Sequence, residues 1–246
     1  MSMSHKVYGI HAVNALLNYQ SQIITTVLLN ADREDAKFQS IIETCERLAI
    51  ELRYVKRREL DDLTQSANHQ GVLALCDKAL QWDETWLYEL TSKTKKTLLL
   101  LVLDGVQDPH NLGACLRSAN AFGVDAVIVP KDRAVGITDV VRKIACGAAE
   151  VTPVVSVTNL KRTIQTLQES NIWFVGLAAK AETDIRELDL TGHVGLVLGS
   201  EGSGLRRLTA EICDFLGKIP MQGMVESLNV SVSAGICLYE AVRQRQ

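Results

Sequence analysis

The stretch TLLLLVLDGVQDPHNLGACLRSANAFG, residues 97–123, decides the fold of most of this chain. It begins with a continuous apolar run and passes through a polar turn into a segment of small and apolar residues. A strand that is apolar on both faces is typical of a parallel sheet covered by helices. Asp108 and Pro109 predict the turn, and Asn111 is a candidate cap for the helix that follows.

The same alternation continues to the C-terminus and predicts one large α/β domain over residues 97–246. Most of its apolar runs are continuous, so we expect buried parallel strands with helices between them. The predicted strands lie at 98–104, 125–130, 152–156, 172–178, 194–199 and 217–220, and a last helix covers 230–244.

A smaller α/β pattern occupies residues 1–78. The segment GIHAVNALLNY has apolar residues at helical spacing. Strands are predicted at 23–30, 51–55 and 71–76, and two further helices at 34–50 and 57–65.

Residues 79–96 lose this periodicity and end in the polar, basic run TSKTKK. Such a run without apolar anchors predicts a linker, with DETWLYEL as a short helix leading into it. The predicted organisation is therefore a first domain at 1–78, a linker at 79–96 and a second domain at 97–246.

The composition is that of a soluble globular protein: of 246 residues, 47% are hydrophobic and 22% are charged, and the net charge is −3. With so small a net charge, any binding of nucleic acid must rest on local basic patches. The chain starts without an apolar signal core, and its longest apolar run, at 98–103, is too short to cross a bilayer. We therefore expect a cytoplasmic protein without a membrane segment.

The six cysteines include no CxxC pair, and several lie in apolar stretches, where a thiol packs as a small hydrophobic group. This pattern argues against a disulfide framework or a zinc site and favours a reducing compartment. Since the sequence shows no other cluster of metal-ligating residues, we expect no metal.

Three predicted strand ends, at 103–123, 198–205 and 219–235, carry unusual polar residues, and ligands bind at strand carboxyl ends in open α/β sheets. In LGSEGSGL (198–205) the glycines depart from the G-x-G-x-x-G order and no P-loop lysine follows. Glu201 would repel a pyrophosphate. The loop therefore favours a ligand with a positive centre and an apolar or aromatic body; a tight strand-to-helix turn without a ligand is the alternative.

The other two loops add an arginine and a polar cluster. Arg117 interrupts a small, apolar segment, so we expect it on the buried side of its helix with a carboxylate partner, for which Glu201 is the obvious candidate. In the third loop, polar side chains gather beside an apolar helix start. Capping explains one of them but not readily all four, although capping alone is the alternative. The four are Ser227, Asn229, Ser231 and Ser233.

Together, DPHNLGACLRSANAFG, LVLGSEGSGLRRLT and IPMQGMVESLNVSVSAGICLYEAVRQR resemble the three signature motifs of the SpoU class of SPOUT methyltransferases. The start YGIHAVNALL and the segment NHQGV (68–72) narrow the resemblance to members that act on bacterial 23S rRNA. It covers nearly the whole chain. Such enzymes transfer a methyl group from S-adenosylmethionine to a ribose 2′-hydroxyl. The resemblance implies a guanosine of the peptidyl-transferase P loop as the target, in naked rRNA or in a large-subunit assembly intermediate.

The resemblance also implies structure that periodicity does not show. The C-terminal domain is expected to be a SPOUT-type parallel sheet with a deep trefoil knot, through which the last motif threads. The N-terminal domain is expected to be L30e-like, similar to that ribosomal protein, and to help bind RNA. The active protein is expected to be a homodimer with its active sites at the interface.

Site residues follow from the motifs by the same resemblance. The implied catalytic positions are Asn111, Arg117, Glu201, Ser227 and Asn229, and the implied cofactor-binding positions are Gly199, Ile219, Met221, Ser227, Leu228 and Asn229. An arginine stays protonated in proteins, so our hypothesis is that Arg117 holds an RNA phosphate or the developing alkoxide and is not the base.

Two basic patches are candidates for RNA contact. The first lies in RYVKRR (53–58) of the N-terminal domain, where a solvated helix start is the alternative, and the second lies beside the catalytic domain. Phosphate contacts from either patch predict strongly salt-dependent binding. The residues are Arg53, Lys56, Arg57 and Arg58 in the first patch, and Lys131, Arg133, Arg142 and Lys143 in the second.

Three other functions stay open at this point. A tRNA ribose methyltransferase of the same class often lacks this N-terminal domain or carries extra basic tails, which does not suit this chain. A nicotinamide-dependent oxidoreductase would need a glycine fingerprint after its first strand, and GVQDPHNLG (105–113) lacks one. A non-catalytic RNA-binding module would not need the polar set at the three strand ends.

Overall fold

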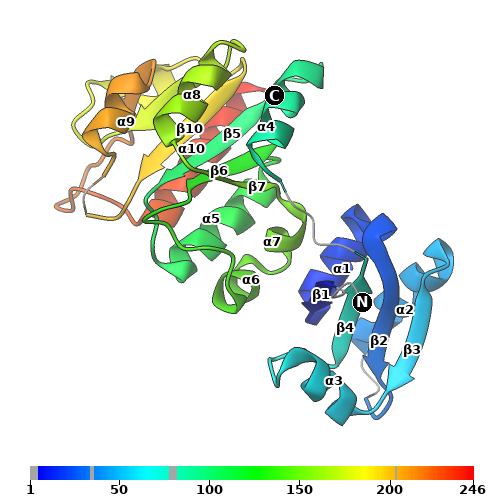
Figure 1. Cartoon of the computed structure of the whole chain (residues 1–246). Helices are drawn as coiled ribbons and strands as arrows, with labels where there is room; N and C mark the ends of the chain where they lie inside the picture. Colours follow the sequence, from blue (N-terminus) through cyan, green and yellow to red (C-terminus); the bar gives the residue numbers. More distant parts are fainter. Residues whose placement is uncertain (1–4, 34–35, 78–81, 203) are drawn as a thin grey trace. The chain divides into compact units, whose positions relative to one another are not determined.

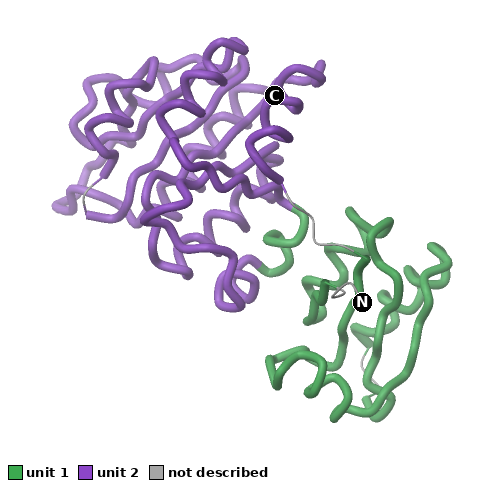
Figure 2. The backbone as a smooth tube through the Cα atoms, in the orientation of Figure 1, with its two compact units in different colours: residues 1–81, 146–151 green, residues 82–145, 152–246 purple. Residues whose placement is uncertain are grey.

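The computed structural model describes residues 5–33, 36–77, 82–202 and 204–246. The chain forms two compact units, residues 1–81 with 146–151, and residues 82–145 with 152–246 (Figure 2). The predicted linker lies at this division; its residues 79–81 fall outside the described ranges, and so do residues 34–35 of a predicted helix.

The first unit is a four-stranded sheet in the order β1-β4-β2-β3. Helices α1 and α2 contribute to one hydrophobic core, and α3 contributes Leu60 to a second core with Leu28, Val55 and Leu73. The alternation predicted for this region is confirmed. The elements are β1 (His5–Tyr8), α1 (Ile10–Tyr19), η1 (Ser21–Ile23), β2 (Ile24–Asn30), α2 (Ala36–Leu48), β3 (Glu51–Val55), α3 (Arg57–Thr64) and β4 (Val72–Cys76).

The second unit is built on a seven-stranded parallel sheet in the order β7-β6-β5-β10-β8-β11-β9 (Figure 1). The parallel sheet predicted from the continuous apolar runs is confirmed. Its strands are β5 (Leu99–Asp104), β6 (Ala126–Pro130), β7 (Val154–Val157), β8 (Trp173–Leu177), β9 (Thr183–Asp184), β10 (Val194–Gly199) and β11 (Phe215–Lys218).

Helices surround this sheet. Alternate residues of β5 point to opposite faces, and one set, including Leu100 and Val102, packs with residues of α4 and α8. α5 packs against α10, and α10 packs against β10. The helices are α4 (Glu84–Lys93), α5 (Pro109–Ala121), α6 (Asp139–Ala145), α8 (Leu160–Gln168), α9 (Arg207–Ile212) and α10 (Val230–Gln244), with η2 at Ile185–Glu187; α7 (Ala148–Val151) groups with the first unit.

Several boundaries differ from the predicted ones. β11 begins at Phe215, because residues 215–217 pair in parallel with residues 175–177 of β8. The range 79–96 contains α4, whose Leu87 is fully buried in the core of the second unit. The trefoil knot and the likeness to ribosomal protein L30e stay predictions, because hydrogen-bonded strand order does not record threading.

No helix among the residues that the structure describes is long and apolar enough to cross a membrane.

Candidate active site

The carboxyl ends of β5 and β10 lie side by side at the centre of the sheet. The two strands pair in parallel, and the register sets Gly199 opposite Asp104. The loops that follow, 105–108 and 200–206, therefore leave the sheet at neighbouring points. Two of the three predicted polar strand ends thus meet at one edge of the sheet, where ligands bind in this class of fold.

The loop after β10 is a tight turn closed by an isolated antiparallel bridge between Ser200 and Gly204. The Gly204 N–H donates to the Ser200 carbonyl at 2.9 Å, and Gly202 and Gly204 have φ of +86° and +66°. A Cβ on Gly199 would overlap the backbone of Gly204 and the amide nitrogen of Leu205. The glycines of GSEGSGL therefore serve backbone geometry, and the loop is a tight turn between β10 and α9.

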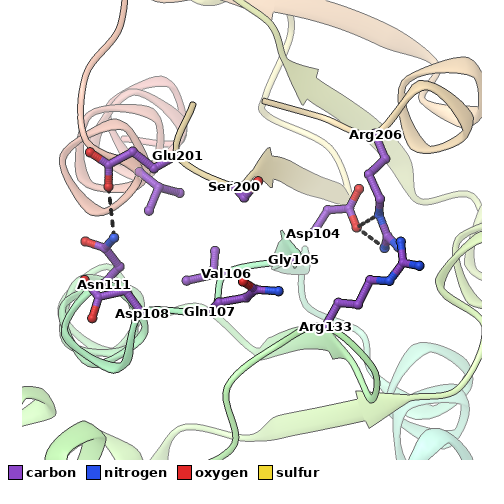
Figure 3. Close-up of a pocket in the computed structure, with 11 residues that line it drawn as sticks. Asp104, Gly105, Val106, Gln107, Asp108, Asn111, Arg133, Ser200, Glu201 and Arg206 are labelled. Carbon is purple, nitrogen blue, oxygen red and sulfur yellow. Dashed lines mark hydrogen bonds and ion pairs between the residues drawn. The ribbon is translucent and has the colours of Figure 1, made fainter. Parts of the chain in front are cut away.

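Glu201 stands in this turn and joins two asparagines from different helices. Its Oε2 accepts a hydrogen bond from Asn111 Nδ2 at 3.1 Å (Figure 3). It accepts another from Asn229 Nδ2 at 3.2 Å. Asn229 Nδ2 also donates to Asn111 Oδ1 at 2.8 Å. Three residues, separated by as many as 118 positions in the sequence, thus form one hydrogen-bonded cluster, which we call the amide–carboxylate cluster.

The orientation of both amides in this cluster is fixed by the start of α10. Asn229 is the N-cap of that helix, and its Oδ1 accepts from the Ser231 N–H at 2.9 Å and from the Ser231 hydroxyl at 2.7 Å. Its Nδ2 must then face Asn111, so Asn111 turns its own Nδ2 toward Glu201. Capping therefore explains Ser231 together with Asn229, more than the single residue that we attributed to it from sequence.

Arg117 and Ser227, the other two predicted catalytic residues, are both exposed. The expectation that Arg117 lies on the buried side of its helix is therefore wrong. It follows Asn111 by six positions on α5, which rotates its side chain away from that of Asn111. Ser227 lies in the segment between β11 and α10.

The predicted cofactor-binding residues occupy the end of β10 and that same segment. Ile219, Met221 and Leu228 are half-buried, and Leu228 precedes the cap residue Asn229. Half-buried apolar side chains such as these suit a flat apolar ring.

A cavity of about 500 Å³ opens beside the cluster. At one side of it, the fully buried Asp104 accepts hydrogen bonds from Arg206 through Oδ1, from Nε at 2.7 Å and from Nη2. These bonds raise the pKa of Arg206. The cavity is lined by Asp104, Gly105, Val106, Gln107, Asp108, Asn111, Arg133, Ser200, Glu201, Arg206 and Val230.

Asp104 and Arg206 were not among the residues that we singled out from the sequence. The sequence feature that could have revealed Asp104 is its position at the end of an otherwise apolar, buried strand. A carboxylate in such a place needs a partner. Its partner lies 102 positions away and could not be read from the sequence.

The predicted basic residues lie in both units. In the first, Arg53 on β3 and three cations around the start of α3 are exposed, and Arg57 lies 3.7 Å from Asp61. In the second, only Arg133 of the predicted patch lines the cavity. The exposed residues are Arg53, Lys56, Arg57, Arg58, Lys131, Arg133 and Lys143, whereas Arg142 on α6 is half-buried.

The cysteines are free thiols, and most are buried. Burial raises the pKa of Cys115 and Cys237, in the helices that carry the cluster, to about 12. These thiols are protonated at neutral pH and are poor nucleophiles. Within the described ranges, no three His, Cys, Asp or Glu side chains gather in a way that could hold a metal ion.

Comparison with known families defines the class of this protein. The model of the SpoU rRNA Methylase family matches residues 98–239, and a model of RNA 2′-O ribose methyltransferase substrate binding matches residues 6–82. The chain therefore belongs to the SpoU methylase family.

Similar proteins and solved structures indicate which members of the family this chain resembles. The chain is 56% identical to the 23S rRNA (guanosine-2′-O-)-methyltransferase RlmB of Coxiella burnetii, over 100% of this chain and 98% of that one. It is 50% identical to the RlmB of Pseudomonas putida, over 100% and 99%. The SpoU methyltransferase AviRb from Streptomyces viridochromogenes, solved in complex with AdoMet, superposes with a TM-score of 0.75 at 23% identity, over 98% of this chain and 90% of that one.

Proposed function

We propose that this protein methylates the ribose 2′-hydroxyl of a guanosine in 23S rRNA with S-adenosylmethionine as methyl donor. The observation that carries the proposal is the amide–carboxylate cluster, which unites residues of all three motifs beside a cavity large enough for a nucleotide. The full-length relatives in Coxiella burnetii and Pseudomonas putida, both named for this reaction, support it over a tRNA substrate.

The reaction is an in-line displacement, for which S-adenosylmethionine supplies a methyl group already activated on a sulfonium. The protein must orient the ribose hydroxyl, remove its proton and stabilise the alkoxide that develops. Asn111 and Ser227 position the hydroxyl. Glu201 positions Asn111, since its carboxylate accepts one amide proton of that side chain.

Arg117 provides positive charge toward the alkoxide or an RNA phosphate. A guanidinium does not act as the base, because arginine is not deprotonated in proteins. Its exposure on α5 fits contact with a bound RNA chain.

The residues present fit S-adenosylmethionine. Gly199, Ile219, Met221 and Leu228 would bind the adenosine moiety, because the last three have half-buried apolar side chains and Gly199 presents backbone groups at the end of β10. Ser227 and Asn229 border this segment with polar groups. Because Glu201 carries the only formal charge in the amide–carboxylate cluster, that cluster is better suited to a sulfonium than to a phosphate.

RNA binding rests on cations in both units, which are exposed except for the half-buried Arg142. Arg53, Lys56, Arg57 and Arg58 belong to the unit that matches the substrate-binding model, which supports a contact with RNA outside the target nucleotide. Lys131, Arg142 and Lys143 add charge to the catalytic unit. Affinity for rRNA should therefore fall steeply with salt concentration. We place the reaction in the cytoplasm, on rRNA or an assembling large subunit.

The catalytic unit also carries a surface suited to a homodimer. Val232, Ile236 and Tyr239 of α10 are 49%, 38% and 58% exposed, and their spacing aligns them on one side of the helix. Phe122, after α5, contacts the Tyr239 ring with centroids 6.3 Å apart. An exposed apolar stripe on the helix that begins at Asn229 supports a dimer whose interface adjoins the active site.

Mapping of 2′-O-methylation on ribosomal RNA from cells with and without this protein tests the proposed function. We expect one guanosine of 23S rRNA to lose its methyl group when the protein is absent and to regain it with the purified protein and S-adenosylmethionine. A change confined to tRNA would contradict the proposal. Calorimetry that detected no binding of S-adenosylmethionine would leave a non-catalytic RNA-binding role.

A further inference from the structure

The cavity beside the amide–carboxylate cluster has two chemically different sides. Asn111, Asp108 and Glu201 line one side, and Asp104, Arg133 and Arg206 lie toward the other (Figure 3). The carboxylates on the first side already accept hydrogen bonds within the protein: Glu201 accepts from two amides, and Asp108 caps α5. The second side combines two guanidinium groups with a single carboxylate and has a net positive charge.

Arg206 is held in place at this side. Two of its nitrogens donate to Asp104 Oδ1, and Asp104 is itself fully buried at the end of the central strand β5. The Arg206 side chain remains 43% exposed, so part of its guanidinium is available to a ligand. A guanidinium oriented in advance by a buried carboxylate loses little conformational entropy when it binds an anion.

Arg133 contributes the second positive charge. It is exposed and has no hydrogen-bond or ion-pair partner among residues 5–33, 36–77, 82–202 and 204–246. Its backbone adopts a left-handed conformation, with φ of +58°, which is uncommon for a residue other than glycine. The side chain extends toward Arg206 at the edge of the cavity (Figure 3).

The buried carboxylate beneath these arginines is incompletely satisfied. Asp104 Oδ2 has no hydrogen-bond partner in the described part of the chain, although it is shielded from solvent. Burying a carboxylate is costly, and among the described residues only Arg206 donates hydrogen bonds to the Asp104 side chain. An apolar residue at position 104 would fill the same space without this cost. The buried ion pair therefore indicates that the site requires an oriented arginine.

We propose that Arg206 and Arg133 bind a phosphodiester group of the RNA inside the active site, adjacent to the ribose that is methylated, and that Asp104 positions Arg206 for this contact. Planar guanidinium groups match the oxygens of a phosphate in a bidentate manner. The amide–carboxylate cluster then faces the ribose hydroxyl while the arginines hold the backbone of the same nucleotide. This inference rests on the proposed function.

The chain provides a matched control at the next position. Arg207 has the same charge and is adjacent in sequence, but its side chain is 78% exposed, pairs with Glu211 and does not line the cavity. Comparison of Arg206→Ala with Arg207→Ala therefore removes one positive charge in each case. The two variants differ in the contact with the cavity and in the partner that loses its ion pair, which is the buried Asp104 for Arg206 and the exposed Glu211 for Arg207.

The test measures binding of full-length protein to a 23S rRNA fragment across a range of salt concentrations. We expect Arg206→Ala to weaken binding about tenfold at moderate salt and to reduce the salt slope by about one unit. Arg133→Ala should act in the same direction, and Arg207→Ala should have a smaller effect. Arg206→Lys, which keeps the charge and loses the fork, should recover only part of the affinity.

Two further measurements separate the explanations. Calorimetry with S-adenosylmethionine should give the same affinity for Arg206→Ala and wild type; a loss confined to this cofactor would mean that the arginines bind its carboxylate, which overturns the proposal. Equal RNA binding by Arg206→Ala and Arg207→Ala would also overturn it. If wild-type protein does not methylate 23S rRNA, the proposed function fails, independently of this comparison. Thermal unfolding of each variant, and the Arg133→Ala result, guard against a folding defect.

Discussion

Glu201 illustrates how one carboxylate can set the geometry of the side chains around it. It lies in a turn where a phosphate ligand would be repelled, and its Oε2 receives two amide donors. Those amides are oriented by the N-cap of α10, so the cap and the site share the Asn229 side chain, which accepts from Ser231 through Oδ1 and donates to the site through Nδ2. A change in Glu201 should therefore act on the positions of other side chains.

We predict that Glu201→Gln lowers kcat by about 10²-fold, because a misplaced Asn111 no longer orients the ribose hydroxyl. The affinity for S-adenosylmethionine should change little if its adenosine moiety is held elsewhere. Single-turnover methylation of an rRNA fragment, with calorimetry of the cofactor, measures both quantities. A variant with wild-type kcat would exclude the positioning role of Glu201.

The limits of sequence-based prediction are clearest at single residues. Asn111, Glu201 and Asn229 were named from the motifs at the predicted strand ends, but the hydrogen bonds that join them were not predicted, because Arg117 was the expected partner of Glu201. The burial of Arg117 was predicted wrongly, since apolar neighbours along a helix do not tell which face is covered. The pair of Asp104 and Arg206 was missed because it depends on the register between β5 and β10.

At the scale of elements, the turn between β10 and α9 depends on a glycine with no space around it. We predict that Gly199→Ala destabilises the protein by about 1–3 kcal/mol, because the new methyl group would overlap backbone atoms that cannot rotate away. Binding of S-adenosylmethionine should weaken in the same variant. Urea unfolding and calorimetry measure the two effects.

Gly192→Ala is the control for this prediction. Its added methyl group would have no atom within 4 Å among the described residues, and its φ is not in the left-handed region. Equal stability of the two variants would show that the turn adapts more readily than its geometry indicates.

Strands with continuous apolar runs were predicted well, and the shortest edge strands were not. β5 and β6 are buried throughout and β10 is buried except at Gly199, so their runs mark them clearly. β1 and β9 have four and two residues and lie at sheet edges, too short for any periodicity to appear. The start of β11 was placed two residues late because the exposed Phe215 and Leu216 belong to it only through pairing with β8.

At the scale of the whole molecule, the exposed stripe on α10 decides the oligomeric state that we propose. We predict that Val232→Glu converts the dimer to a monomer, because a carboxylate would be buried without a partner at the interface. The rate of rRNA methylation should fall in the same variant. Light scattering coupled to size-exclusion chromatography measures the mass. Gln165→Glu, which adds the same charge on an exposed position of α8, should remain dimeric; a dimeric Val232→Glu would locate the interface elsewhere.

The order of strands in the central sheet has a consequence for how the protein is made. β5 borders β6 on one side, but its other neighbour, β10, comes some 90 residues later, with Leu99 beside Val194. During synthesis β5 presents an open, apolar edge until the ribosome has delivered residue 199. Such an edge invites wrong pairing and chaperone capture. The pairing of β5 with β10 at the centre of the sheet, and the turn that contains Glu201, therefore form late in the assembly of the enzyme.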